Sequence, residues 1–115
     1  MADATIDRAV FEELKTTAGA DFVRELVGTF LSEAPGMLAE LRDSLSARDP
    51  DRFRRAAHSL KSNSNTFGAS ALAGMAKQLE LGGFGAARAG PGEPLAALSS
   101  EYARVARVLT GLNRA

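Results

Sequence analysis

The chain has 115 residues, of which 45% are hydrophobic and 24% charged, and its formal net charge is zero. These values fit one globular domain over residues 1–115, and the absence of cysteine excludes disulfides and thiolate metal sites. No apolar run approaches the roughly 18 residues that a membrane span needs, and residues 1–5 lack the basic and apolar segments of a secretory signal. We therefore expect a cytoplasmic protein without a membrane partner.

The charges are unevenly distributed along the chain. Residues 1–51 contain 11 acidic and five basic side chains, whereas residues 52–88 contain six basic side chains and one acidic side chain. This asymmetry suggests an acidic or anionic partner surface, although ordinary solvated helix faces would give the same pattern.

The spacing of apolar residues predicts helices and no convincing strand. A short first helix is expected over about 7–16, followed by a break at 17–20. Asp21 is a plausible N-cap for a second helix with a wide apolar face. Within that face, three residues near the start are expected in the core: Phe22, Val23 and Leu26. The family resemblance described below implies, as the alternative, that some of them are exposed for docking.

Pro35 interrupts the second apolar pattern, and a third helix is expected from about 35 to 47. The sequence leaves open whether Pro35 makes a kink or a true break. Asp49 as N-cap and Pro50 at the first helical position predict a fourth helix over about 50–67, which Gly68 ends.

The remaining pattern predicts a fifth helix over about 70–81 and a last helix over about 94–112. Residues 82–94 are rich in glycine and proline and are expected to form a loop, with a possible helical turn at 86–89. The predicted fold is all-α: an up-and-down four-helix bundle core with a short additional N-terminal helix packed on it.

The only histidine of the chain, His58, lies in the fourth helix but off its apolar stripe. It is within one helical turn of four polar residues, Arg54, Arg55, Lys61 and Ser62. An imidazole that faces water among cations is poorly explained by core packing. It is well placed to meet an anion.

A role for His58 as a metal ligand is not expected, because the chain has no second histidine, no cysteine and no acid in the fourth helix after Asp51. The same absence of acids argues against a Ser-His-Asp set. A nucleophile needs exposure and a neutral imidazole, and both are expected here. The glycine-rich stretch at 82–85 follows a helix and lacks the Lys-Ser/Thr ending of a phosphate-binding loop, so no nucleotide site is predicted. No metal or other bound cofactor is expected in this chain either.

The motif His58-Ser59-Leu60-Lys61, with Gly68 ten residues after the histidine, resembles the phosphorylatable motif of histidine-containing phosphotransfer (HPt) domains. That family pattern is His-x-Leu-Lys-Gly, then small polar residues, then Gly. The resemblance extends over nearly the whole chain in helix order and spacing. It departs at Ser62, where the family most often has Gly, and in the glycine-rich stretch after Leu81.

The resemblance implies a phosphocarrier of a two-component phosphorelay, not an enzyme, and no autonomous kinase activity. His58 would accept a phosphoryl group from the phosphoaspartate of a receiver domain and pass it to another receiver, and Lys61 would help to hold it. The implied partners are response-regulator receiver domains, which would supply Mg²⁺, and a hybrid sensor histidine kinase; a monomer is expected. The remaining candidates are possible partner contacts, Arg54, Arg55, Ser62 and Asn65, and structural positions, Leu60 and Gly68.

Two alternative functions belong to other classes. The first is a helical adaptor that is never phosphorylated. The second is DNA binding, because the segment 50–81 superficially resembles a helix-turn-helix. Its second helix carries Lys77 as its only cation, opposed by Glu80, and the whole chain is neutral. Nucleic acid is therefore not an expected partner.

Overall fold

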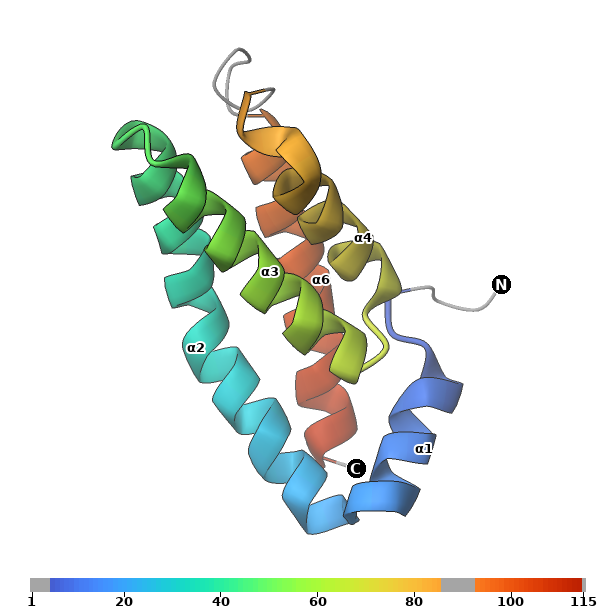
Figure 1. Ribbon diagram of the computed structural model, residues 1–115. Coiled ribbons are helices and arrows are strands. Elements are labelled where there is room, and N and C mark those ends of the chain that lie inside the picture. Colours follow the sequence, from blue (N-terminus) through green and yellow to red (C-terminus); the bar gives the residue numbers. More distant parts are fainter. Residues whose placement is uncertain (1–4, 86–92, 115) are drawn as a thin grey trace.

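The computed structural model describes residues 5–85 and 93–114 and shows helices packed side by side (Figure 1). The elements are α1 (Arg8–Ala18), α2 (Ala20–Ser46), α3 (Pro50–Thr66), α4 (Ser70–Gln78), the π-helical turn η1 (Leu79–Gly83) and α6 (Glu93–Arg114). Successive long helices run in opposite directions, and α1 lies across one end of the bundle (Figure 1). The predicted all-α, up-and-down bundle is confirmed. None of the described helices is both long and apolar enough to cross a membrane.

The core is built from the stripe of each helix that the apolar spacing predicts. In α3, Phe53, Ala57 and Leu60 are fully buried. The ring of Phe30 on α2 contacts those of Phe67 and Tyr102, with centroids 5.4 and 5.9 Å apart. These contacts join α2, the end of α3 and α6, so α3 is held firmly on its inner side.

The predicted interruption of the second helix at Pro35 is wrong, because α2 is one continuous helix from Ala20 to Ser46. Proline has no N–H to donate to the carbonyl four residues earlier, which is that of Leu31. The Tyr102 hydroxyl on α6 lies 3.5 Å from this carbonyl and donates a long hydrogen bond to it. A partner from another helix thus satisfies the group that Pro35 leaves unpaired.

The start of α2 also differs from the prediction. Asp21 is not the N-cap; it lies in the first turn of a helix that begins at Ala20, and Gly19, with φ 97°, is the cap. Phe22 is 51% exposed and not in the core, whereas Val23 is buried and Leu26 is partly buried. The reason is helical geometry: the buried positions follow Val23 at intervals of about four residues, and Phe22 points about 100° away from that stripe.

Gly68 allows the N-terminal segment to lie against the turn between α3 and α4. Its φ is 78°, and a Cβ there would meet the Asp7 carbonyl oxygen at 2.9 Å and the Val10 Cβ at 3.0 Å. The Asp7 amide donates to the Gly68 carbonyl at 2.8 Å, and Asp7 Oδ1 caps α1. Gly68 therefore follows the end of α3, as predicted, and also admits the start of α1.

The end of α4 is kinked where the sequence predicts a stop. Backbone angles leave the helical range at Leu81 and at Gly82, whose φ of 124° suits glycine alone. After the kink, the Phe84 ring packs edge-on against Phe53 with centroids 5.4 Å apart. The helical turn predicted at 86–89 lies outside the described residues, and α6 begins at Glu93, one residue before the predicted start.

Candidate functional site

His58 lies on the outer face of α3, as its position off the apolar stripe predicts, and 56% of its side chain is exposed. Asp49 and Pro50 fix the start of this helix: the Asp49 carboxylate accepts a hydrogen bond from the Arg52 amide at 3.1 Å. Leu60 is fully buried on the inner face. The anchored inner stripe therefore determines that His58 points to solvent.

Glu80, from η1, joins His58 and Lys61 through one carboxylate. His58 Nδ1 lies 2.8 Å from Glu80 Oε2, and Lys61 Nζ lies 2.7 Å from Oε1. The Glu80 side chain is 15% exposed, and its Oε1 is enclosed and held by the Lys61 ammonium as an ion pair, not as a well-directed hydrogen bond. Two residues one turn apart on α3 thus share a single carboxylate.

The electrostatics keep this carboxylate charged. The Lys61 ammonium first, and the His58 imidazole second, hold the pKa of Glu80 below its ordinary value, against the opposing effect of burial. An ionised Glu80 can only accept a hydrogen bond, so in its neutral form the His58 ring carries its proton on Nδ1. This leaves the lone pair on Nε2 free, which is the form of imidazole that attacks electrophiles.

The expectation that no acid lies near His58 is therefore wrong. It considered only the helix that carries the histidine, and α3 indeed has no acid after Asp51. Glu80 comes from the neighbouring antiparallel segment, 22 residues away in sequence. A signal was present: Glu80 is the one acid in residues 52–88, and His58 and Glu80 lie at similar distances from the Gly68 turn. In the described parts of the chain, no three His, Cys, Asp or Glu side chains form a group that could hold a metal ion.

The two predicted partner-contacting arginines lie on the exposed face of α3, before His58. Arg54 Nη2 pairs with Asp51 Oδ1 at 2.7 Å, and Arg55 Nη2 lies 3.8 Å from Asp51 Oδ2. Arg54 chiefly, with help from Arg55, lowers the pKa of Asp51. Part of the positive charge that the sequence places near His58 is therefore balanced locally.

The small polar residues after His58 divide between the two faces of α3. Ser62 and Asn65 are exposed, and their positions fall on the same face as the histidine. Ser64 is fully buried, and its hydroxyl donates to the Leu60 carbonyl at 2.6 Å. The side chains that surround the imidazole on the outer face are thus small or cationic, which leaves Nε2 accessible.

Comparison with known proteins places this arrangement in a family. The Hpt domain family matches residues 25–108, well over half of the chain. This chain belongs to the Hpt domain family. The crystal structure of histidine-containing phosphotransfer protein B (HptB) from Pseudomonas aeruginosa PAO1 matches this Hpt domain with a TM-score of 0.87 and 25% sequence identity, over 98% of this chain and 97% of that one. No curated protein is significantly similar to the chain in sequence.

The family match confirms the resemblance that the motif around His58 suggested. It also confirms the predicted function of the Hpt domain, which is histidine phosphotransfer in a two-component phosphorelay. The adaptor and DNA-binding alternatives are not favoured.

Proposed function

We propose that this Hpt domain carries a phosphoryl group on Nε2 of His58, which it accepts from the phosphoaspartate of one receiver domain and passes to the aspartate of another. The observation that carries this assignment is the contact of Glu80 with Nδ1, which leaves Nε2 as the exposed, unprotonated nitrogen. His58 is also the only histidine in the chain.

The transfer step is a direct displacement at phosphorus. The Nε2 lone pair forms the N–P bond while the bond between phosphorus and the aspartyl oxygen breaks, and the aspartate leaves as a carboxylate. The imidazole ring gains positive charge as the bond forms, with its proton still on Nδ1. Glu80, 2.8 Å from that nitrogen, stabilises the charge and holds the ring in one orientation. Reversal of the same step transfers the group to the next receiver.

Lys61 is the proposed ligand of the phosphoryl group. Its side chain is 25% exposed and lies one helical turn from His58. A phosphoryl group on the imidazole competes with Glu80 for this ammonium, because it offers several charged oxygens on the open side of the site. We propose that Lys61 moves from the carboxylate towards the phosphoryl oxygens on transfer. Arg54, Arg55, Ser62 and Asn65 are the proposed contacts to the partner.

The remaining components come from the partners. We propose that the receiver domain supplies Mg²⁺ and the other catalytic groups, and that a hybrid sensor histidine kinase is the source of phosphoryl groups. The Hpt domain then acts as a phosphocarrier without kinase activity of its own. We further propose that it works as a cytoplasmic monomer. The lack of cysteine is compatible with a reducing compartment.

The test is phosphoryl acceptance by the wild type and by His58→Gln. Each protein is mixed with a panel of phosphorylated receiver domains and Mg²⁺, and separately with phosphoramidate, a small donor that needs no docking. We expect acid-labile, base-stable label on the wild type and none on His58→Gln, which keeps its fold because the site is exposed. Circular dichroism and a thermal melt check the fold. Label on folded His58→Gln would exclude His58 as the acceptor.

A further inference from the structure

Glu80 continues the side of α4 that packs against α3. Ala73 and Ala76, seven and four residues earlier, lie on the same side of the helix and are buried. Small side chains at these two positions let α3 and α4 pack closely, and the Glu80 side chain, 15% exposed, fills the next position. The contact of Glu80 with His58 therefore depends on the path of the backbone at the end of α4.

The segment after Glu80 is rich in glycine. Residues 82–85 read Gly-Gly-Phe-Gly, so Phe84 is the one residue of this segment that has a side chain. Glycine gives the backbone more freedom than any other residue, and helix ends open locally more readily than helix centres. A turn of this composition needs an anchor if Glu80 is to keep one position.

Phe84 supplies such an anchor. Gly82, with φ 124°, turns the chain, and the half-buried Phe84 ring packs edge-on against the fully buried Phe53, with centroids 5.4 Å apart. Phe53, Glu80 and Phe84 line one cavity of about 290 Å³. The turn is thus attached to α3 on both sides of the kink, by Glu80 before it and by Phe84 after it.

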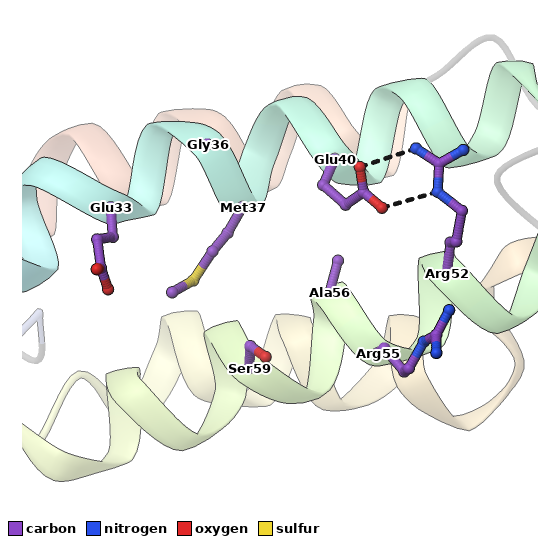
Figure 2. Close-up of a pocket in the computed structure, with 8 residues that line it drawn as sticks. All are labelled: Glu33, Gly36, Met37, Glu40, Arg52, Arg55, Ala56 and Ser59. Carbon is purple, nitrogen blue, oxygen red and sulfur yellow. Dashed lines mark hydrogen bonds and ion pairs between the residues drawn. The ribbon is translucent and has the colours of Figure 1, made fainter.

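The part of α3 that Phe84 contacts is fixed from the opposite flank. Arg52 donates two hydrogen bonds to Glu40 of α2, from Nε at 2.8 Å and from Nη2 at 2.9 Å (Figure 2). Phe53 is the next residue, and its side chain belongs to the hydrophobic core. Because the Phe84 ring rests on a part of α3 that is held by the core and by α2, it can hold the turn in place.

We infer that Phe84 is a positioning residue for phosphotransfer: its ring, which the turn at Gly82 brings to Phe53, holds the Glu80 carboxylate on Nδ1 of His58. The inference rests on the proposed function, in which Glu80 keeps the proton on Nδ1 and leaves Nε2 free. The contact between Glu80 and an imidazole that is 56% exposed is weak by itself, because water competes for both groups. The packing of two aromatic rings is not weakened by that competition.

The test uses the tautomer of the single histidine as its readout. Nitrogen NMR, at a pH where the ring is neutral, should show the proton on Nδ1 in the wild type and in Phe84→Tyr, which keeps the ring. Phe84→Ala should show a mixture of the two tautomers, close to that of Glu80→Ala. We also expect phosphoramidate to label Phe84→Ala about tenfold more slowly than the wild type, because Nε2 is less often free and aligned for attack.

Leu112→Ala controls for a general loss of packing. Leu112 is half-buried and packs on the core, and the end of α6 that carries it lies at the opposite end of the bundle from η1 (Figure 1). This variant should be less stable to urea than the wild type, as Phe84→Ala should be, but its tautomer and labelling rate should not change. The inference would be overturned if Phe84→Ala kept its proton on Nδ1 and was labelled within about twofold of the rate of Leu112→Ala.

A pair of glycine substitutions tests the same turn without removing the ring. A Cβ at Gly82 or at Gly85 would meet nothing within 4 Å, but only Gly82 has a φ in the left-handed region. Gly82→Ala therefore strains the turn and should shift the tautomer towards a mixture, whereas Gly85→Ala should not. This pair decides the question if Phe84→Ala does not fold, since equal tautomers in the two variants would then overturn the inference.

The NMR comparison also separates this inference from the proposed function. If neither a receiver nor phosphoramidate labelled the wild type, the proposed function would fail. The tautomers of the wild type and of the variants, which need no phosphoryl donor, would still decide whether Phe84 positions Glu80.

Discussion

The two flanks of α3 differ in whether their charged side chains are paired within the domain. On the flank towards α4, Glu80 is largely buried and closes a network with His58 and Lys61. On the flank towards α2, a groove is open; Glu33 on its wall has no charged partner among the described residues, and Arg55 has only a 3.8 Å ion pair with Asp51. The histidine lies between a closed network and an open surface.

This difference separates chemistry from recognition. A nucleophile needs a fixed orientation, because misalignment with the phosphorus atom slows the displacement. The Glu80 contact supplies that orientation from within the fold. A recognition surface needs free groups that a partner can satisfy, and the α2 flank provides them. Substitutions on the two flanks should therefore affect different kinetic parameters.

The largest effect is expected on the closed flank. Glu80→Ala should lower the transfer rate at saturating receiver concentration by about 100-fold, because Nδ1 loses the acceptor that fixes the tautomer and stabilises the ring charge. The measurement is rapid-quench transfer kinetics. Nitrogen NMR of the single histidine provides a readout that a merely structural role would not change: the wild type should show the proton on Nδ1, and the variant a mixture of tautomers.

Glu80→Gln separates the two contributions of this residue. Its amide oxygen still accepts a hydrogen bond but carries no charge, so the tautomer should be kept while the rate falls by an intermediate amount. Equal rates in the wild type and Glu80→Ala would show that the network on this flank does not assist the transfer.

A smaller effect is expected at Lys61. Lys61→Ala should fold normally, transfer about tenfold more slowly and lose its phosphoryl group faster, because one cation beside the phosphoryl oxygens is removed. Lys77→Ala, an exposed lysine on α4, is the matched control. Phosphohistidine lifetime and transfer rate are measured together. Unchanged values for both variants would make Lys61 an ordinary surface residue.

The smallest effect concerns stability on the open flank. Arg52 holds the pKa of Glu40 below its ordinary value of 4.5. The stability that this pair contributes is therefore fully present above pH 4.5 and is lost as the pH falls through the lowered pKa. Urea unfolding from pH 3 to 7 should show that Glu40→Gln is less stable than the wild type at pH 7 and that the difference narrows in acid.

Glu33 provides the internal comparison for that measurement. It lies on the same helix without a charged partner in the described residues, so Glu33→Gln should leave both the stability and its acid dependence unchanged. If Glu33→Gln lost as much stability to urea as Glu40→Gln does, the Glu40–Arg52 pair would add no stability of its own.

The helices and the family motif could be predicted from sequence because their signals are local. The Asp49-Pro50 start of α3 depends on neighbouring residues, and the exposure of His58 follows from the spacing of apolar residues within one helix. The motif from His58 to Gly68 then placed the chain in its family. Each of these inferences spans fewer than about 20 residues.

The features that only the tertiary structure determined depend on contacts between segments far apart in sequence. Glu80 reaches His58 across 22 residues, and the Tyr102 hydroxyl reaches the Leu31 carbonyl across 71, which explains how α2 continues through Pro35. The groove likewise requires α2 and α3 together. The spacing of apolar residues indicates which face of a helix turns inward, but it does not indicate which side chain of another helix meets the outward face. That pairing is fixed only when the bundle packs.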